Sequence, residues 1–452
     1  MMNHLIVSVS NPHHCHAWEY LLQQIYPNLR VHVVDEDWEG KAGNGLGTLY
    51  AFHKTQKKHN LIADMEQGAS VTIYHTAGSG KRLYPLVATE NNNKGAVQLP
   101  ALTDDRPLTL LEAVIRQTIS LAHPGRLTVF WGDQLFFPTV RPRAPQTAIE
   151  IFSKELPFPN HSLWQERHLN RYGLIAHNAR KEVLLFDKIE EANFLELIDN
   201  KIIDPKGSFA TSLGCFSLEI NLLQQLLHLF RDEILEKKGS ADTDPHFWMP
   251  LILDRETYLQ LTGSSMESHY QKMRNGISLS QPIFDTINIG GDSPWWDFGS
   301  TVSYFNSCKA LTSPEGQSLR DFFELDPTPS PYLDIDKSSI LINCSIGRGY
   351  IRNSVLMNVV ADEIDVEESI LIGARAPKIF SHKSLGYKIR DQEPINLTDG
   401  SVRSDWFNPQ TKEWVILETH QQSCGKEDWE KLIGNNPYRW SEVESINTRP
   451  PL

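Results

Sequence analysis

The chain has 452 residues, of which 40% are hydrophobic and 22% charged, and its formal net charge is −13. This composition is typical of a folded globular protein and not of a disordered chain, and the negative field argues against a generic nucleic-acid or anionic-membrane surface. The five cysteines show no C-x-x-C spacing, which favours a reducing compartment. The apolar run near the N-terminus is too short for a signal peptide or membrane span, so we expect a cytoplasmic protein with neither a membrane nor a nucleic-acid partner.

The first 60 residues predict a β-α-β order that ends in a glycine-rich turn and a helix. Apolar runs at 5–10 and 29–34 flank a helical pattern at 16–26, and the segment EGKAGNGLGTLYAFHKTQKK follows at 39–58. Three adjacent acids, Asp35, Glu36 and Asp37, precede this turn. They could contact a base or ribose, or they could simply end a strand in solvent.

Residues 71–133 continue the alternation of strands and helices. An apolar strand at 71–74 leads into the loop HTAGSGKRLYP, an amphipathic helix is expected at 108–122, and a strand at 126–131 ends in Gly132-Asp133. Such alternation predicts a mostly parallel sheet with helices on both faces. In these sheets ligands bind at the carboxyl ends of the strands, which is where GNGLGT, AGSGKR and GDQ fall.

The loop after the strand at 71–74 has the composition of a phosphate-binding turn. An ATPase-type P-loop is disfavoured, because His75 occupies the position of its first glycine and Arg82 that of its magnesium-binding hydroxyl. Small residues from Ala77 to Gly80 nevertheless let backbone N–H groups approach an anion, and Lys81 and Arg82 add positive charge. The alternative is a tight turn with solvated cations.

Extended to Lys94, the segment AGSGKRLYPLVATENNNKGAVQLP at 77–100 resembles the signature of sugar-1-phosphate nucleotidyltransferases, G-x-G-T-R-L-x-P-L-x(4-6)-P-K-P. Lys81 replaces the usual Thr, and Asn93 and Gly95 flank Lys94 in place of prolines. Four later segments resemble further landmarks of the family in the same order. They are WGDQ at 131–134, YGLIAHNARKEVLLFDKIEE at 172–191 (with Ile189 in place of a proline), SLGCFSLEI at 212–220 and SPWWDFGSTVSYFN at 293–306.

One landmark of this family, an α-β unit with a base-contacting turn, is missing between Lys94 and Asp133. Residues 1–60 supply such a unit, with Leu46-Gly47-Thr48-Leu49 as its turn. The resemblance therefore implies a Rossmann-like, GT-A-like nucleotidyltransferase sheet in circularly permuted order. HTAGSGKRLYP and NKGAVQLP are also similar to the motifs H-x-G-G-x-S-x-R-x-P and G-K-x-x-x-x-L-P of the fucose-1-phosphate guanylyltransferase family.

The character of the chain changes near residue 326. We expect a catalytic domain at 1–325, in which 1–60 is the displaced base unit, and a Pro-rich linker at 326–336. Residues 337–400 carry short apolar pairs such as NSVL and ESIL between small polar residues. This pattern predicts a left-handed parallel β-helix, with a small β-sandwich as the alternative, and residues 401–452 are not assigned.

The resemblance implies transfer of a nucleotidyl group from a nucleoside triphosphate to a sugar 1-phosphate with Mg²⁺, GTP and a fucose-1-phosphate-like sugar being preferred. Asp133 and Asp297 would hold the metal, Arg82 would bind the triphosphate, and Lys94 would contact the α-phosphate or the sugar phosphate. With Asp133, these two cations form the expected catalytic set. The expected nucleotide-binding residues are Gly45, Gly47, Thr48, Ala77, Gly78, Ser79, Gly80 and Lys81, and the expected sugar-phosphate-binding residues are Lys188 and Gly214.

Two other functions remain open on the sequence alone. The departures at Lys81, Asn93, Gly95 and Ile189 also suit a non-catalytic, regulatory sugar-nucleotide-binding protein, and the C-terminal repeats suit an acyltransferase, although few regular coils support it. The histidines of HHCH at 13–16 are expected at the surface, and Phe247 and Trp248 in the core. A homo-oligomer formed through the C-terminal domain is a further expectation.

Overall fold

The computed structural model describes residues 3–78, 80–278, 280, 282–325, 333–422, 431–432 and 436–448. The chain divides into two compact units. Unit 1 comprises residues 1–75, 118–131 and 137–293, and unit 2 comprises residues 76–117, 132–136 and 294–452.

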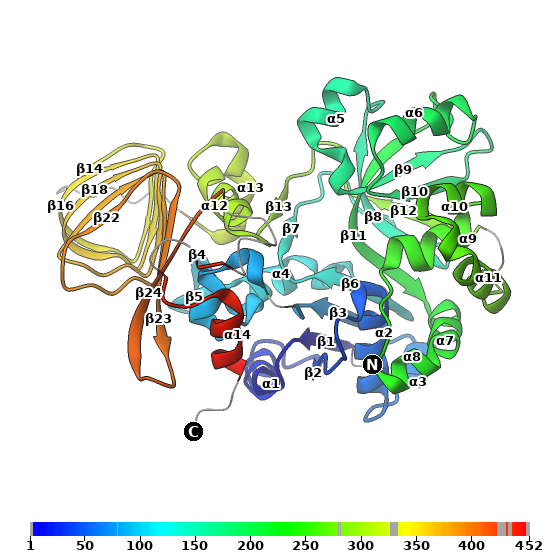
Figure 1. Cartoon of the computed structure of the whole chain (residues 1–452), viewed down its shortest axis with the longest axis horizontal. Helices are drawn as coiled ribbons and strands as arrows, with labels where there is room; N and C mark the ends of the chain where they lie inside the picture. Colours follow the sequence, from blue (N-terminus) through cyan, green and yellow to red (C-terminus); the bar gives the residue numbers. More distant parts are fainter. Residues whose placement is uncertain are drawn as a thin grey trace. The chain divides into compact units, whose positions relative to one another are not determined.

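Unit 1 is built on a nine-stranded sheet (Figure 1). Its strands are β1 (His4–Val9), β2 (Arg30–Asp35), β3 (Val71–His75), β6 (Arg126–Trp131), β8 (Ile149–Leu156), β9 (Gly173–His177), β10 (Val183–Asp187), β11 (Phe209–Glu219) and β12 (Phe284–Asn288). The neighbours β2, β1, β3 and β6 are all parallel, whereas β11 pairs antiparallel with β6, β8 and β9. β1 and β3 are buried along their whole length, as strands covered on both faces are. The prediction of an α/β fold with a mostly parallel sheet is confirmed in the part of the sheet that carries the glycine-rich turns.

The helices of unit 1 are α1 (His13–Ile25), α2 (Gly43–Gln56), α3 (Leu61–Glu66), α5 (His161–Arg167), α6 (Glu191–Asp199), α7 (Ile220–Leu229), α8 (Arg231–Glu236), α9 (Met249–Ile252), α10 (Arg255–Thr262) and α11 (Glu267–Gly276), together with the short turns η4 (Ile119–Leu121), η5 (Leu169–Arg171), η6 (Thr243–Trp248) and η7 (Ser264–Met266). The helix expected at 16–26 is α1. In the described part of the chain no helix combines the length and apolar character needed to cross a bilayer.

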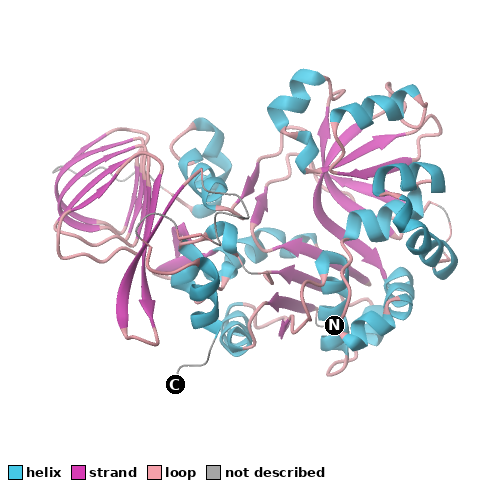
Figure 2. Cartoon of the chain, in the orientation of Figure 1, coloured by secondary structure: helices cyan, strands magenta, loops and turns pink. Residues whose placement is uncertain are grey.

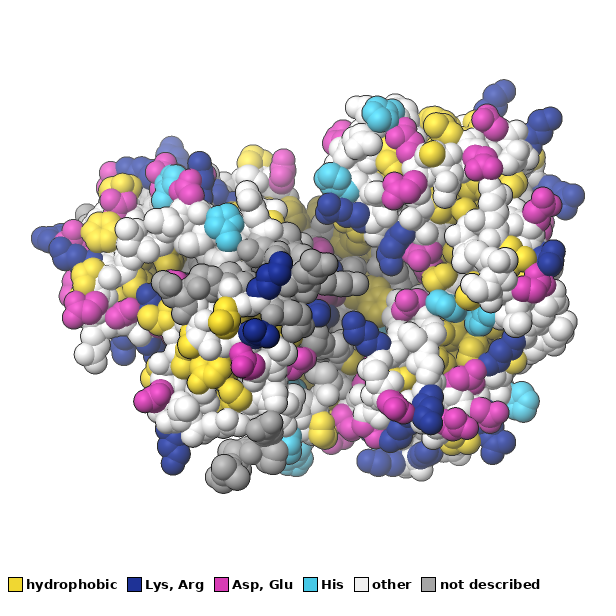
Figure 3. Space-filling view, viewed as in Figure 1, with side chains coloured by type: hydrophobic (Ala, Val, Ile, Leu, Met, Phe, Trp, Pro, Cys, Tyr) yellow, Lys and Arg dark blue, Asp and Glu magenta, His cyan; other side chains and the backbone are white. Residues whose placement is uncertain are grey.

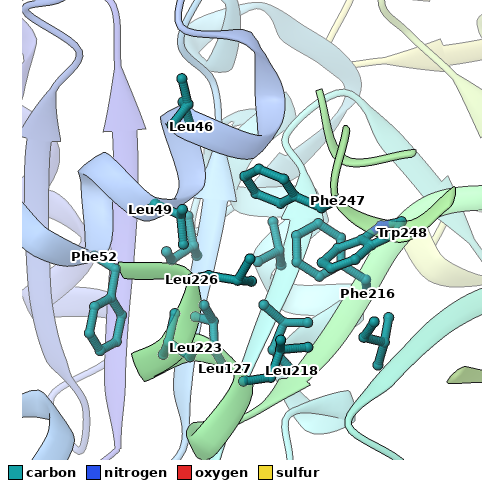
Figure 4. Packing of buried hydrophobic residues seen from close by; sticks show 14 of the residues in the cluster. Leu46, Leu49, Phe52, Leu127, Phe216, Leu218, Leu223, Leu226, Phe247 and Trp248 are labelled. Atoms are coloured by element: carbon teal, nitrogen blue, oxygen red, sulfur yellow. The ribbon is translucent and has the colours of Figure 1, made fainter. Parts of the chain in front are cut away.

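Helix α2 is held in the core of unit 1 by its apolar face. Figure 4 shows this cluster, which includes Leu46, Leu49, Phe52, Leu127, Phe216, Leu218, Leu223, Leu226, Phe247 and Trp248. The predicted core positions of Phe247 and Trp248 are confirmed, because their exposed fractions are 2% and 0%. The glycine-rich turn at the start of α2 is therefore fixed by a helix that cannot move without exposing this core.

Unit 2 begins with the loop that follows β3. Its first elements are η1 (Lys81–Leu83), η2 (Leu86–Glu90), η3 (Lys94–Ala96), β4 (Gln98–Thr103), β5 (Arg106–Thr109), α4 (Leu110–Thr118) and β7 (Gln134–Phe136), and later come β13 (Trp295–Asp297), α12 (Thr301–Ala310), η8 (Pro314–Gly316) and α13 (Gln317–Phe323). The helix expected at 108–122 begins only at Leu110, since residues 106–109 pair with β4 in a hairpin.

The C-terminal part of unit 2 contains two further sheets, drawn in magenta in Figure 2. One consists of the parallel strands β14 (Leu333–Ile335), β16 (Ser345–Arg352), β18 (Val360–Glu367), β20 (Lys378–His382) and β22 (Ile395–Leu397). The other consists of the parallel strands β15 (Ile340–Ile342), β17 (Val355–Met357), β19 (Ile370–Ile372), β21 (Leu385–Tyr387) and β23 (Ser401–Asn408), with β24 (Glu413–His420) antiparallel at its edge. The two sheets take their strands alternately from the chain. Of the linker predicted at 326–336, residues 326–332 lie outside the described residues.

A ladder of buried serines keeps these parallel strands in register. The backbone N–H groups of Ser354, Ser369 and Ser384 donate to the hydroxyl oxygens of Ser339, Ser354 and Ser369, over 3.1, 3.0 and 3.2 Å. Ser339, Ser354 and Ser369 each precede an apolar pair, as in NSVL and ESIL, and Ser384 precedes Leu385-Gly386. The repeat thus supplies one buried polar contact and one apolar layer for each strand.

Candidate active site

The loop after β3 places Gly80 against Lys94. Gly80 has a φ of 63°, and a Cβ atom there would lie 3.0 Å from Val87 Cγ2 and 3.7 Å from Lys94 Cβ. Glycine suits this position because the backbone is left-handed and the neighbouring side chains leave little room. The first and last parts of the signature segment are therefore in contact. Ala77, Gly78 and Lys81 belong to the same loop, and Ser79 lies outside the described residues.

Two short strands bring the predicted metal ligands together. β7 and β13 pair antiparallel with Asp297 opposite Gln134, the residue after Asp133, and the Phe298 N–H donates to the Asp133 carbonyl over 2.8 Å. A Cβ atom at Gly299 would lie 2.8 Å from Asp133 Oδ2 and 3.0 Å from Asp297 Oδ1. Both carboxylates therefore border the same small volume, which stays open because residue 299 is glycine.

Lys94 joins this pair of carboxylates. Its Nζ donates to Asp133 Oδ2 over 2.8 Å, and the two side chains are only 15% and 12% exposed. An ion pair that is largely shielded from water holds both partners more firmly than a surface pair does. The structure therefore brings three of the predicted catalytic and metal-binding residues, Lys94, Asp133 and Asp297, into one cluster.

The electrostatics of Asp297 reflect this crowding. Its side chain opens to solvent on one side, yet surrounding protein raises the pKa of the carboxyl by desolvation, and the nearby Asp133 raises it further. The Gly299 N–H, which donates to Asp297 Oδ1 over 2.7 Å, lowers the pKa again, as do Arg82 and Lys94. The carboxylates of Asp133 and Asp297 are close enough to repel each other, and a bound cation would relieve the repulsion.

Arg82 lies close enough to act on Asp297 but is itself exposed. Within the described residues its guanidinium has no hydrogen-bond or ion-pair partner. A guanidinium group is planar and positively charged at any physiological pH. When no protein group occupies its N–H donors, it can bind an anion. This geometry is compatible with the predicted contact to a triphosphate.

In unit 1 the predicted base-contacting residues lie at the start of α2. Gly45 is closely packed, since a Cβ atom there would lie 2.8 Å from the Ala241 carbonyl and 2.9 Å from the Phe247 ring, which accounts for a glycine at this position. Thr48 donates its hydroxyl hydrogen to the Asn44 carbonyl over 2.8 Å and contacts His75 Nε2 over 2.8 Å.

Gly214 belongs to the same neighbourhood of unit 1. It has a φ of 74°, and a Cβ atom there would lie 2.4 Å from Trp131 Nε1, so only glycine fits. Trp131 in turn stacks on His75 with ring centroids 5.4 Å apart. Contacts therefore run without a break from Gly214 through Trp131 and His75 to Thr48.

Lys188, the other predicted sugar-phosphate ligand, lies just after β10 in unit 1. Its Nζ is 3.7 Å from Asp187 Oδ1, and its side chain is 63% exposed. Burial raises the pKa of Asp187. Burial also raises the pKa of Asp244 to about 7, with Asp187 contributing, although Asp244 keeps some contact with solvent.

Sequence reasoning missed two residues near these groups. Gly299 could have been found from the WWDFG segment, where it follows the predicted metal ligand by two positions. Asp244 carried no signal, because its position beside Gly173, where a Cβ atom would lie 3.0 Å from Asp244 Oδ2, depends on contacts between distant segments. Within the described residues, no three His, Cys, Asp or Glu side chains are placed to hold a metal by themselves.

On the face drawn in Figure 3, described Lys and Arg side chains are interspersed with Asp and Glu side chains. No protein-family model and no curated protein matches the sequence.

Proposed function

We propose that this protein is a magnesium-dependent nucleotidyltransferase that joins a nucleoside triphosphate to a sugar 1-phosphate and releases pyrophosphate. The observation that carries the proposal is the cluster of Asp133, Asp297 and Lys94 around Gly299, with Arg82 nearby. Two carboxylates with two cations near them suit a reaction between anions, in which positioning and charge neutralisation lower the barrier.

The donor set of this cluster fits magnesium. Mg²⁺ prefers oxygen ligands and is commonly held by one or two carboxylates, with phosphate oxygens and water completing its shell. Asp133 and Asp297 supply such carboxylates, and their mutual repulsion favours a cation between them. The metal would neutralise charge on the phosphates of the bound triphosphate.

The chain's own residues then have separate tasks. Arg82 would bind the triphosphate through its fork of N–H donors, and Lys94, held by Asp133, would direct its charge at the α-phosphate. An oxygen of the sugar phosphate attacks the α-phosphorus, the bond from that phosphorus to the oxygen bridging to the β-phosphate breaks, and pyrophosphate leaves with the electron pair. No covalent intermediate with the protein is needed.

The circular permutation is also part of the proposal. In the parallel block β2-β1-β3-β6, β1 pairs with β3, the strand that leads into the signature loop, and β2 pairs with β1. The glycine-rich turn of α2 follows β2, so residues 1–60 are suited to bind the base of the triphosphate.

For the C-terminal sheets, the alternation of strands and the serine ladder support a parallel β-helix, and we retain left-handedness as an expectation. Among the described residues, Cys15, Cys308 and Cys344 form no disulfide, which supports a reducing compartment such as the cytoplasm.

The test is pyrophosphate release by the purified full-length chain, with several nucleoside triphosphates each combined with several sugar 1-phosphates, starting from GTP and fucose 1-phosphate. We expect release only when Mg²⁺, a triphosphate and a sugar 1-phosphate are all present. Release without the sugar phosphate would indicate simple hydrolysis. Binding of nucleotide or sugar nucleotide without release from any combination would favour the regulatory alternative.

A further inference from the structure

The three consecutive acids after β2 have different surroundings in the structure. Asp35 and Asp37 are both paired: Lys54 Nζ lies 2.8 Å from Asp35 Oδ1 and 2.6 Å from Asp37 Oδ1. Lys237 and the Tyr50 hydroxyl also donate to Asp37. These contacts give Asp35 and Asp37 a structural role, because they connect the end of β2 to α2.

Glu36 has no such partner. Its backbone N–H donates to the Val9 carbonyl over 2.8 Å, which holds the residue at the carboxyl end of the parallel block. Its Oε2 lies 3.0 Å from the point where a Cβ atom of Gly47 would be, and among the described residues nothing forms a hydrogen bond or ion pair with its carboxylate. Burial raises its pKa to about 7. The protein therefore leaves a partly buried acceptor that solvent reaches and that a ligand with hydrogen-bond donors could engage.

A ligand that binds the ionised form of Glu36 must offer two adjacent hydrogen-bond donors, because an ionised carboxylate only accepts. Guanine offers such a pair in its N1–H and N2–H₂ groups. Adenine, cytosine and uracil each place acceptors beside their donors. A ribose with its 2′- and 3′-hydroxyls is the other nucleoside group with two adjacent donors, and carboxylates at strand ends bind ribose in some dinucleotide-binding folds.

The surroundings of Glu36 favour the base over the ribose. Gly47 presents no side chain, and the His75 ring, whose Cε1 lies 3.8 Å from the same Cβ position, stacks on Trp131 with an interplanar angle of 30°. His75 is itself buried, and Trp131, on which it stacks, is partly exposed, so the Trp131 ring is the flat surface here that suits a planar base. All of these residues belong to unit 1.

We infer that Glu36 is the residue that selects guanine, by accepting hydrogen bonds from N1–H and N2–H₂ of a guanine nucleoside triphosphate. This inference rests on the proposed function, which supplies the triphosphate, and deepens it by assigning the residue that recognises the base.

The experiment is equilibrium binding of GTP, ITP, ATP and 2′-deoxy-GTP to the full chain with Mg²⁺, by titration calorimetry. ITP differs from GTP only in lacking the N2 amino group, and 2′-deoxy-GTP lacks only one ribose hydroxyl. We expect GTP to bind about tenfold to a hundredfold more tightly than ITP, 2′-deoxy-GTP to bind nearly as tightly as GTP, and E36Q to bring the GTP-to-ITP ratio close to one. Asp35→Asn is the matched control, since it removes an acid one position away that is already paired, and it should leave this ratio unchanged.

Three results would overturn the inference. A folded E36Q that keeps the full GTP-to-ITP ratio would show that another group reads the base. Equal weakening of all purine nucleotides by E36Q, with a large loss for 2′-deoxy-GTP in the unaltered protein, would place Glu36 on the ribose. Pyrophosphate release that prefers ATP or UTP would refute guanine selection while leaving nucleotidyl transfer intact, whereas absence of both nucleotide binding and release would refute the proposed function and the inference with it.

Discussion

Arg82 and Lys94 lie on one loop of unit 2, but their surroundings differ. Lys94 is 15% exposed and ion-paired with Asp133, whereas Arg82 is exposed and has no partner within the described residues. A fixed ammonium group that is shielded from water is suited to stabilising the charge of a transition state. An exposed guanidinium group is suited to binding a ligand from solution. The two cations are therefore expected to affect different kinetic parameters.

Arg82→Lys keeps the charge and loses the fork, so it should weaken triphosphate binding by roughly 1–3 kcal/mol and raise the KM for that substrate. Lys94→Met keeps the stem and removes the charge, so it should mainly lower kcat. Steady-state kinetics with each substrate varied in turn measures both effects. Normal turnover by Lys94→Met together with an inactive Arg82→Lys would mean that Lys94 has only a structural role.

At the residue scale, sequence patterns identified the glycine-rich turns and the acidic residues, but they could not show which of several adjacent acids is paired with a cation. Asp35, Glu36 and Asp37 are adjacent acids, and only the positions of Lys54 and Lys237 in the fold distinguish them. Only the family resemblance predicted that Asp133 and Asp297 belong to one site. Their proximity depends on the pairing of β7 with β13, and each of these strands is three residues long. Strands this short leave no periodicity to recognise.

At the scale of elements, the C-terminal helix α14 (Trp440–Thr448) is held against the segment between Arg82 and Lys94. Asn447 Nδ2 donates to the Ala88 carbonyl over 2.9 Å and to Asn92 Oδ1 over 3.0 Å, and Asn92 Nδ2 donates to the Glu444 carbonyl over 3.0 Å. Trp440 packs edge-on against Tyr84 with ring centroids 5.4 Å apart. The tail that the sequence left unassigned therefore supports the loop that carries both cations.

Asn447→Ala should destabilise the protein by about 1–3 kcal/mol, because Asn92, whose exposed fraction is 3%, would lose a buried hydrogen-bond partner. It should also lower kcat more than it raises KM, since the position of Lys94 depends on this loop. Thermal unfolding and steady-state kinetics measure the two effects. Ser441→Ala, an exposed position on the same helix, is the control and should change neither.

An Asn447→Ala protein with unchanged thermal stability and rate would show that α14 does not support the loop. The sequence could not predict this element because α14 is nine residues long and its register is set by contacts with residues 84–92, far away in the chain. The prediction of a helix at 108–122 was wrong at its start for a related reason. The pairing of β5 with β4 overrides the local helical pattern there, so the helix begins at Leu110.

At the scale of the whole molecule, two buried histidines, His4 and His32, link the stability of the fold to pH. His4 Nε2 lies 2.9 Å from Asp64 Oδ2, and His4 Nδ1 lies 3.0 Å from His32 Nε2, while the His32 and His59 rings are 4.1 Å apart. Burial lowers the pKa of His32 to about 3, helped by His59 and His4, and burial also lowers the pKa of His4. Both lie at the amino ends of β1 and β2.

A histidine whose pKa is lower in the folded state than in the unfolded chain stabilises the fold above pH 6.5, and this stability is lost as the pH falls toward the folded pKa. For His32 the loss at pH 5 should be about 2 kcal/mol. We therefore expect a lower Tm at pH 5 than at pH 7.5 and a smaller difference in His32→Gln. His161→Gln, at an exposed position, should behave like the unaltered protein. An unchanged pH dependence in a folded His32→Gln would assign the acid sensitivity to other groups.

The parallel block of the large sheet was predictable because β1, β3 and β6 are continuous apolar runs of strand length. The antiparallel strands β8 and β11 were not predicted as elements, since their pairing with each other is long-range. The permuted order and the β-helix remain predictions.

Magnesium-dependent nucleotidyl transfer is tested by the Mg²⁺ dependence of pyrophosphate release from a triphosphate and a sugar 1-phosphate, measured for the unaltered protein, Asp133→Asn and Asp297→Asn. Each substitution keeps the shape of the side chain and removes a charged metal ligand. The account predicts a saturable rise in rate with Mg²⁺ for the unaltered protein, loss of the rate with a chelator, and rates at least about a hundredfold lower in both variants at an unchanged Tm. Release that persists in chelator, or that both variants catalyse as fast as the unaltered protein, would contradict it.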